Sequence, residues 1–160
     1  AIAEWSLIME IERKFLIRQL PEHLEQYPCR HIEQGYLCTN PVVRIRKQDD
    51  AYFLTYKSGG LMAREEYNLP LTAEGYEHLR PKTDGLLITK KRYCIPFGTY
   101  TIELDIFDGE LAPLILAEVE FPSEDEANNF TPPEWFTEDV TYSGKYHNSY
   151  MSHHGYHPEA

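Results

Sequence analysis

Acidic and basic side chains alternate in the segment Glu10-Ile11-Glu12-Arg13-Lys14 near the N-terminus. In an extended strand successive side chains point to opposite faces, so Glu10, Glu12 and Lys14 would share one face. Carboxylate oxygens suit Mg²⁺ or Mn²⁺, and a neighbouring lysine could contact phosphate oxygens held by the same metal. The spacing therefore predicts one half of a site for metal-assisted phosphate chemistry, although a solvated strand face would show the same pattern.

Pairs of like charges recur at the same two-residue spacing farther along the chain. An ordinary surface strand mixes the signs of its charges, and like charges at alternate positions repel unless a ligand or a partner strand compensates them. Closing such strands with their charged faces inward would give a polar lumen that suits a linear polyphosphate beside a metal ion. The basic pairs are Arg44 with Arg46 and Lys90 with Arg92, and the acidic pairs are Glu103 with Asp105 and Glu118 with Glu120.

Eight stretches of the sequence predict β-strands that could carry these side chains. Short turn sequences such as Asp49-Asp50 join several of them, which favours antiparallel pairing, and Thr72 and Ser123 are typical helix caps. The predicted fold is therefore mainly β (α+β), a closed or nearly closed eight-stranded antiparallel β-barrel, or tunnel, with peripheral short helices. The expected strands cover residues 10–16, 34–38, 42–47, 52–57, 61–69, 87–95, 100–107 and 114–121, and the expected helices cover residues 20–27, 72–80 and 123–130.

The composition limits the classes of partner. With 160 residues, of which 42% are hydrophobic and 26% charged, the chain is expected to form one folded domain. Its formal charge of −11 and its pI of about 5.0 argue against a general binder of nucleic acid or anionic membranes, because those partners attract basic surfaces. No apolar run approaches the roughly 20 residues that span a bilayer, and no signal-peptide pattern opens the chain, so we expect a cytoplasmic protein.

Cysteine usage and the chain ends carry further expectations. Cys29, Cys38 and Cys94 are odd in number and lack Cys-x-x-Cys spacing, so we expect buried free thiols without a disulfide framework or a structural zinc site. Residues 1–8 precede Met9 and are expected to be either an extension that is not native to the protein or a flexible N-terminal extension. Residues 9–151 would form the domain, and the histidine-rich residues 152–160 would form a flexible tail.

Seven charged motifs follow one another in a fixed order along the chain. They are Glu10-x-Glu12-x-Lys14, Arg44-x-Arg46, Lys57, Arg64-x-Glu66, Lys90-x-Arg92, Glu103-x-Asp105 and Ala117-Glu118-Val119-Glu120. This order resembles that of CYTH-domain proteins, the triphosphate tunnel metalloenzymes. Residues 139–141, followed by residues 145–149, resemble the C-terminal motif of that family, so the resemblance covers nearly the whole chain from residue 10 to about residue 151.

The resemblance implies an eight-stranded tunnel that binds a triphosphate and hydrolyses it with Mg²⁺ or Mn²⁺. The implied metal ligands are Glu10 and Glu12 with Glu118 or Glu120, and Glu103 and Asp105 are further candidates. The implied phosphate-binding residues are Lys14, Arg44, Arg46, Lys57, Arg64, Lys90, Arg92 and Lys145. The implied catalytic set is Glu10, Glu12, Lys14, Arg44, Arg46, Lys57, Glu66, Lys90, Arg92, Asp105, Glu118 and Glu120.

Three of these acids have several possible roles, and two positions depart from the family pattern. Glu66, Glu103 and Asp105 could bind a second metal, position water or hold basic side chains in place. A tyrosine, a serine and a glycine precede Lys145 where the family often has Gly-Asp, which bears on the role of that lysine. Asn68 stands where an acidic residue often follows the Arg-x-Glu pair, which weakens the case for a second metal on this strand.

The predicted activity is metal-dependent hydrolysis of inorganic tripolyphosphate to release orthophosphate, with nucleoside triphosphates as further substrates. The acidic charge and compact length leave little room for a separate domain that recognises a base. The alternatives are a class IV-type adenylyl cyclase, which makes cyclic AMP from ATP in a similar tunnel, and a non-catalytic polyphosphate-binding module. The expected partner is thus a triphosphate, without nucleic acid or membrane, and the oligomeric state is left open.

Overall fold

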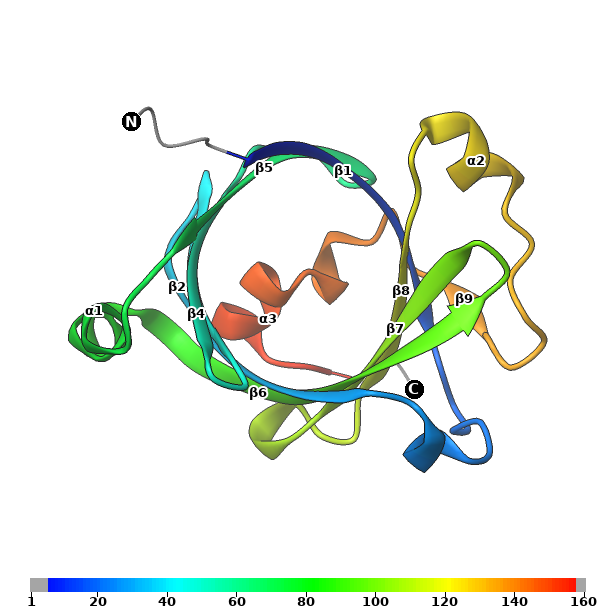
Figure 1. Ribbon diagram of the computed structural model, residues 1–160, viewed down its shortest axis with the longest axis horizontal. Coiled ribbons are helices and arrows are strands. Elements are labelled where there is room, and N and C mark those ends of the chain that lie inside the picture. Colours follow the sequence, from blue (N-terminus) through cyan, green and yellow to red (C-terminus); the bar gives the residue numbers. More distant parts are fainter. Residues whose placement is uncertain (1–5, 158–160) are drawn as a thin grey trace.

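Antiparallel strands wrap into a closed barrel, which Figure 1 shows nearly end-on. The computed structural model describes residues 6–157 of the chain. The strands are β1 (Ser6–Leu16), β2 (Cys29–Thr39), β3 (Val42–Gln48), β4 (Ala51–Lys57), β5 (Ala63–Pro70), β6 (Asp84–Phe97), β7 (Tyr100–Phe107), β8 (Ile115–Glu120) and β9 (Glu138–Asp139). They pair in the order β5-β4-β3-β2-β6-β7-β8-β1-β9, and a further pairing of β1 with β5 closes the barrel. The predicted fold is confirmed, with β9 as an additional short strand.

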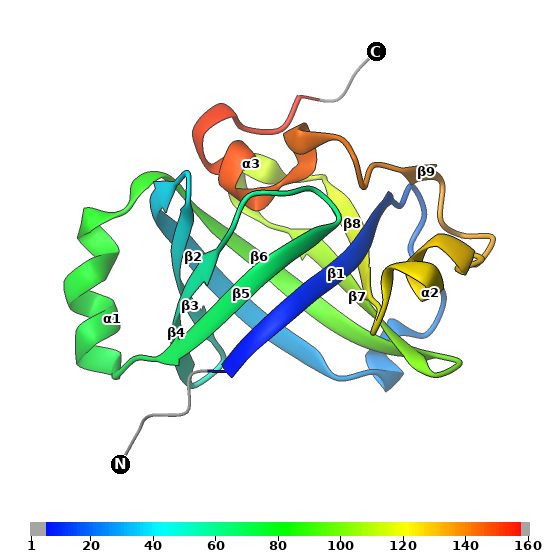
Figure 2. The same cartoon turned by 90° about the horizontal axis from the view of Figure 1, so that it is seen from above.

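Short helices surround the barrel or lie across one of its ends (Figure 2). As predicted, the hydroxyl of Thr72 accepts a hydrogen bond from the Gly75 N–H at the start of α1, and the hydroxyl of Ser123 accepts one from the Glu126 N–H at the start of α2. The helices are α1 (Ala73–Leu79), α2 (Glu124–Asn129) and α3 (Asn148–His154), and the 3-10 turns are η1 (Leu24–Gln26), η2 (Arg80–Lys82), η3 (Gly109–Leu111) and η4 (Gly144–Tyr146).

Strand β1 closes the barrel by changing its partner along its length. Its first half, up to Ile11, pairs with β5, and its second half, from Glu12, pairs with β8. Glu10 therefore lies opposite Arg64, whereas Glu12 lies opposite Glu120. This exchange of partners brings residues of three strands together at one point of the barrel wall.

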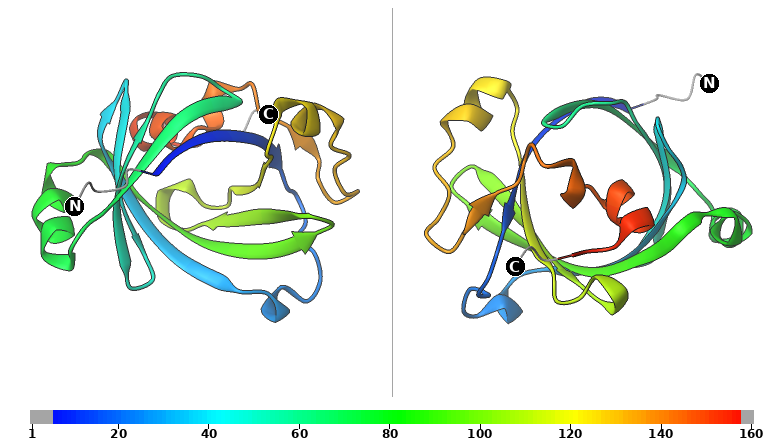
Figure 3. Two further views of the ribbon diagram at one scale, coloured as in Figure 1. Left: turned by 45° about the horizontal axis from the view of Figure 1, so that its top comes forward. Right: turned by 180° about the vertical axis from the view of Figure 1, so that it is seen from behind.

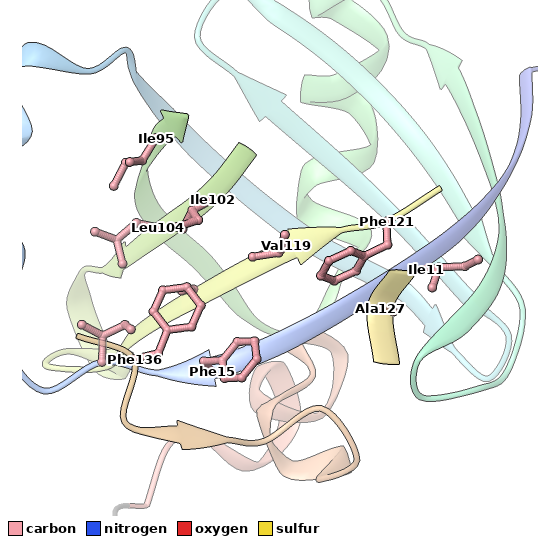
Figure 4. Packing of buried hydrophobic residues seen from close by; sticks show 11 residues of the cluster. Ile11, Phe15, Ile95, Ile102, Leu104, Val119, Phe121, Ala127 and Phe136 are labelled. Atoms are coloured by element: carbon pink, nitrogen blue, oxygen red, sulfur yellow. The ribbon is translucent and has the colours of Figure 1, made fainter. Parts of the chain in front are cut away.

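Residues that alternate with the charged positions form an apolar layer on the outside of the barrel (Figure 4). Phe15 on β1 packs against Phe136, with ring centroids 4.7 Å apart, and both lie in the same buried cluster as Ala127 of α2. The outer face thus obtains its hydrophobic core from α2 and the segment that follows it, as the alternation predicted. The buried members of the cluster are Ile11, Phe15, Ile17, Ile95, Ile102, Leu104, Ala117, Val119, Phe121, Ala127 and Phe136.

Helix α3, in red, lies at one end of the barrel (Figure 3, right). The inner face changes from charged to apolar side chains toward that end. Two residues beyond Glu118 the inward position is Leu116, and two residues beyond Asp105 it is Phe107. Both belong to a buried cluster with Met151 of α3, which is fully buried. This second cluster seats α3 in the barrel and closes that end.

Several elements differ from the prediction. Residues 20–27 contain the short turn η1 and no α-helix. Leu24 and Tyr27 are only partly buried against the outer cluster, and η1 has no fully buried residue, which is little packing to stabilise a short helix. Strand β2 begins at Cys29, five residues before the predicted start, because β6 supplies backbone partners for Cys29, Arg30 and His31. All three cysteines are free, as expected, but Cys29 is exposed and the other two are half-buried.

Among residues 6–157, regular structure extends past both expected domain boundaries, residues 9 and 151. Strand β1 begins at Ser6, which pairs with Asn68, while residues 1–5 lie outside the described residues. Helix α3 continues to His154, and Ser152 is buried, although the expected flexible tail began there. Within residues 6–157, no helix has the length and hydrophobicity needed to cross a membrane.

Helix α1 is fastened to the outside of the barrel by Glu33 on β2. The Tyr76 hydroxyl donates a hydrogen bond of 2.8 Å to Glu33, and Nε of Arg80 donates another of 2.8 Å to the same carboxylate. The hydrogen bond from Arg80, against a smaller opposing effect of burial, lowers the pKa of Glu33 below its usual range. Because Tyr76 is fully buried, its hydroxyl depends on this acceptor.

We expect Glu33→Gln to lower the free energy of unfolding by about 1 kcal/mol near neutral pH. A folded-state pKa below the unfolded value stabilises the fold above the unfolded pKa, and this stabilisation is lost as the pH falls through the folded pKa. The difference between wild type and variant in urea unfolding should therefore shrink below about pH 4.5. Glu77→Gln, on an exposed position of the same helix, is the matched control; a difference that persists undiminished in acid would contradict this role.

Candidate active site

The lumen of the barrel contains a cavity of about 320 Å³ that collects charged side chains from β1 and from β3 to β8. Seven of the chain's 15 lysines and arginines line it, together with six of its 26 acids, so a strongly acidic protein has a lumen with more cations than anions. The cations are Lys14, Arg44, Arg46, Lys57, Arg64, Lys90 and Arg92, and the acids are Glu10, Glu12, Glu66, Glu103, Glu118 and Glu120.

Three carboxylates meet where β1 exchanges β5 for β8. Glu10, Glu12 and Glu120 each offer an oxygen within 4.8 Å of the others, which is the arrangement of a possible metal site. Burial, with the nearby charges of Glu118 and Glu10, raises the pKa of Glu12 to about 8. Burial and the charge of Glu103 raise the pKa of Glu120 to about 7. Closely spaced carboxylates that repel one another are stabilised by a bound cation, and their hard oxygen atoms suit a divalent cation.

Glu10 is held by cations from β4 and β5. Nζ of Lys57 lies 3.0 and 2.9 Å from the two carboxylate oxygens, and Nη2 of Arg64 lies 3.4 Å from one of them. The same ammonium group is 3.2 Å from Glu66, whose carboxylate accepts a hydrogen bond from Asn68. Asn68, at the position where the family often has an acid, therefore joins this network as a neutral residue.

Asp105 binds two basic side chains of the cavity but does not itself line the cavity. It is fully buried and lies 2.7 Å from Nζ of Lys90, and it accepts hydrogen bonds of 2.7 and 2.9 Å from Arg92. Asp105 does not line the cavity, so the expectation that it is a metal ligand or a catalytic group is not supported by its position. Among the roles considered, it holds basic side chains in place. Glu103 does line the cavity and lies 2.8 Å from Nη1 of Arg92.

Burial and neighbouring charges change the pKa values of several side chains in the lumen. Burial, with the charge of Arg92, lowers the pKa of Lys90 to about 8 despite its contact with Asp105. Burial alone would raise the pKa of Glu118, but Lys14 and Arg92 hold it well below its usual range. Glu118 thus stays ionised as a partner for these cations, at 3.7 Å from Lys14 and 3.8 Å from Arg92.

The guanidinium groups of β3 form the part of the cavity most suited to an anion. Nε of Arg44 is buried without a hydrogen-bond partner among residues 6–157. Burial and the charges of Arg44 and Arg92 lower the pKa of Arg46 to about 9. Arg46 is oriented by Gln34, whose side-chain oxygen accepts two hydrogen bonds of 2.9 and 2.6 Å. A bound polyanion would relieve this repulsion and could accept the unused hydrogen bond.

The closed end of the cavity contains residues of the C-terminal motif for which no role was expected from the sequence. Asn148, Ser149 and His147 line the cavity, and Oδ1 of Asn148 accepts a hydrogen bond of 3.3 Å from Nζ of Lys90. Burial, and then the charges of Lys14 and other cations, lower the pKa of His147 to about 3, so its imidazole is neutral near pH 7. Their place in the C-terminal motif was the available sequence signal, but no strand alternation indicated which way they face.

Lys145 lies elsewhere. It is exposed in η4, beside a groove on the outside of the barrel, and it does not line the cavity. The expectation that Lys145 binds phosphate in the lumen is therefore not supported by its position. Apart from Lys145 and Asp105, all of the predicted metal, phosphate-binding and catalytic residues converge on one cavity.

The arrangement can hold a divalent cation and an extended polyanion side by side. The carboxylate cluster lies on one wall, and the lysines and arginines that surround it provide paired and single donors for phosphate oxygens. The cavity is near the lower limit of the roughly 300–1,000 Å³ that is usual for small-molecule sites. Its size and charge favour a short chain of phosphoryl groups.

Two known proteins are similar to this chain in sequence. Inorganic triphosphatase from Nitrosomonas europaea is 44% identical over 149 residues, which cover 89% of this chain and 96% of that protein. Inorganic triphosphatase from Acetivibrio thermocellus is 36% identical over 121 residues, which cover 72% of this chain and 76% of that protein.

Solved structures confirm the relationship. The crystal structure of the inorganic triphosphatase NE1496 superposes with a TM-score of 0.69 and 38% identity, over 95% of this chain and 98% of that one. A putative adenylate cyclase from Bacillus halodurans has a TM-score of 0.59 over 77% of this chain and 86% of that one, but its 17% identity shows the fold alone. The sequence pattern of the CYTH domain matches residues 9–151, and the chain therefore belongs to the CYTH domain family.

Proposed function

We propose that this protein is a divalent-metal-dependent inorganic triphosphatase that hydrolyses tripolyphosphate to orthophosphate and pyrophosphate. The observation that carries the proposal is the convergence of seven cationic side chains and a three-carboxylate cluster on one small cavity. Two relatives that are 44% and 36% identical to this chain over the aligned residues are inorganic triphosphatases, which supports the same activity here.

Glu10, Glu12 and Glu120 would hold the metal, with Mg²⁺ or Mn²⁺ as the cations that match carboxylate oxygens. A divalent cation at this position supplies charge neutralisation of phosphate oxygens and activation of water for in-line attack. Nζ of Lys57 lies 2.9 Å from the Glu10 carboxylate, so this lysine is next to the proposed metal site and could contact a phosphate group bound there. Glu118, by contrast, is engaged with Lys14 and Arg92 and serves mainly to orient them.

The basic residues bind the substrate and stabilise the charge that develops on the leaving group. Arg44 and Arg46 present planar guanidinium groups that can donate two hydrogen bonds to one phosphate. Lys90 and Arg92 are fixed by Asp105, so their donors are oriented before the substrate arrives. Donors that need no reorganisation stabilise a transition state better than mobile ones.

The lumen favours an inorganic triphosphate over a nucleotide. Its lining consists mainly of charged and polar side chains, and Tyr36 and Phe53 are the aromatic residues among them. Most of the surface therefore suits phosphoryl groups rather than a base, and nucleoside triphosphates are the second choice as substrates. Cyclisation of ATP is the alternative reaction that the same fold could support.

A substrate panel tests the proposal directly. We expect orthophosphate release from tripolyphosphate with Mg²⁺ or Mn²⁺, slower release from ATP, no cyclic AMP, and no release with excess chelator. Phosphate release and chromatography of nucleotides measure these products. Formation of cyclic AMP as the main product would identify a cyclase, and tight binding of tripolyphosphate without metal-stimulated turnover would identify a binding module.

Glu12→Gln should weaken Mn²⁺ binding and reduce metal-dependent turnover by at least about 100-fold, because it removes one negative ligand while keeping the side-chain shape. Calorimetric titration of Mn²⁺ and steady-state kinetics measure the two effects. The control is Glu65→Gln, at an exposed position on the neighbouring strand β5. Wild-type metal affinity in the Glu12 variant would contradict the ligand assignment.

Arg46→Ala should impair substrate binding or catalysis without lowering the thermal midpoint of the free protein by more than a few degrees. The substitution removes the repulsion between Arg46 and the neighbouring Arg44 and Arg92. This gain in stability offsets the loss of the hydrogen bonds from Arg46 to Gln34. Scanning calorimetry and kinetics separate stability from function, with Lys91→Ala, an exposed residue of β6, as the control. A collapse of the thermal midpoint without substrate would show that Arg46 is mainly structural.

A further inference from the structure

One edge of strand β1 changes its neighbour close to the carboxylate cluster. Strand β5 pairs with this edge as far as Ile11, and β9 pairs with it from Phe15 onward, while β8 pairs with the opposite edge. Lys14 lies between the two pairings. Buried backbone groups need hydrogen-bond partners, so the backbone of Lys14 must find partners on this edge outside the two strand pairings.

The two residues after β9 supply these partners. The Lys14 N–H donates a hydrogen bond of 3.0 Å to Oγ1 of Thr141, and the Lys14 carbonyl accepts one of 2.8 Å from the Val140 N–H. Thr141 is buried, with only 3% of its surface exposed. Its hydroxyl therefore takes the place of a backbone carbonyl and continues the barrel wall beside Lys14.

Asp139 fixes the direction of the Thr141 hydroxyl. Oδ1 of Asp139 accepts hydrogen bonds from both the N–H and the hydroxyl of Thr141. The Lys14 carbonyl is a more distant acceptor, 3.5 Å from the same hydroxyl. A hydroxyl carries one proton, and because that proton is directed at Asp139, the lone pairs of the oxygen are left for the Lys14 N–H.

Arg13 holds the other oxygen of the Asp139 carboxylate. Nη2 of Arg13 lies 2.8 Å from Oδ2, and Nη1 donates hydrogen bonds of 3.0 and 3.2 Å to the carbonyls of Ala127 and Phe130. Burial would raise the pKa of Asp139, but the hydrogen bonds from Thr141 and Arg13 hold it below its usual range. The carboxylate is therefore ionised near neutral pH and is fixed between β1 and the end of α2.

This chain of contacts ends at a cation of the cavity. Lys14 lines the cavity, whereas Arg13, Asp139 and Thr141 do not, so these three residues can affect a bound ligand only through other residues. The Lys14 ammonium group lies at hydrogen-bond distance from a single backbone carbonyl, 3.3 Å away, and its carboxylate neighbour is farther, at 3.7 Å. The hydrogen bonds to its backbone therefore contribute to where this ammonium group lies. A small displacement of a donor can greatly weaken its contact with a bound anion.

We infer that Asp139 and Thr141 are positioning residues that hold Lys14 in place for contact with a bound phosphate, and that Arg13 orients Asp139 from the outer face of the barrel. This inference rests on the proposed function, because it takes Lys14 as a phosphate-binding residue. The outer face of β1 thus contributes to the site on its inner face.

A double-mutant cycle tests whether Thr141 acts through Lys14. Calorimetry with Mg²⁺ measures the affinity for a bis-methylene triphosphate, whose bridges resist hydrolysis. Thr141→Val removes the acceptor at nearly constant shape and should weaken binding about tenfold. In a Lys14→Met background, which lacks the ammonium group, the same substitution should change the affinity less than about twofold. An equal loss in both backgrounds would show a general structural effect and overturn the inference.

Conservative variants separate positioning from folding. Thr141→Ser keeps the hydroxyl and should bind within about threefold of wild type, whereas a loss as large as that of Thr141→Val would overturn the inference. Asp139→Asn removes the charge that Arg13 holds and should weaken binding about threefold, again only when Lys14 is present. It replaces Thr141→Val in the cycle if the thermal midpoint shows that the valine variant does not fold. Glu138→Gln, an exposed neighbour in β9, is the control and should bind like wild type.

These outcomes are distinct from those that test the proposed activity. If the cycle shows the coupling but tripolyphosphate is not hydrolysed, the proposed function fails and the positioning role stands. If tripolyphosphate is hydrolysed but the effects are additive, or Lys14→Met binds like wild type, the positioning role fails and the proposed function stands.

Discussion

Charges buried inside the barrel are compensated by opposite charges on neighbouring strands, and the site depends on this compensation. Removing an ion from water costs several kcal/mol, which is offset when a partner is close and well oriented. Asp105 between Lys90 and Arg92, at 2.7 Å from each, shows the fully compensated case. The carboxylates of Glu12 and Glu120, directly opposite each other on β1 and β8, show the uncompensated case. A bound metal ion would compensate these carboxylates, and a bound polyanion would compensate the lysines and arginines of the cavity.

Different parts of the same strands contribute to the hydrophobic core and to the candidate site. Inward positions that line the cavity are mostly charged or polar, whereas inward positions farther toward the end closed by α3 are apolar and pack against that helix. The charged cavity and the apolar cluster that holds α3 therefore lie next to each other along the same strands. The apolar outer face, covered by α2 and residues 130–136, keeps the barrel wall rigid around the charges.

Alternation along the strands was sufficient to predict the barrel and most of the cavity lining. Alternation does not show which of the inward-facing residues reach the cavity. Asp105 was therefore grouped with the cavity residues, although it is fully buried and does not line the cavity. Alternation also does not apply outside strands, so it could not indicate that Lys145 lies outside the cavity or that α3 packs against the barrel. The apolar inward positions Phe107 and Leu116, next to charged ones, were the unused signal that something packs into that end against Met151.

A crystal structure with Mn²⁺ and a non-hydrolysable triphosphate, in which anomalous scattering locates the metal, would show whether the lumen holds both ligands together. We expect manganese bound by Glu10, Glu12 and Glu120, with phosphate oxygens within hydrogen-bond distance of Nε of Arg44. Manganese or triphosphate bound outside the lumen, with the carboxylate cluster and Arg44 unchanged, would contradict it.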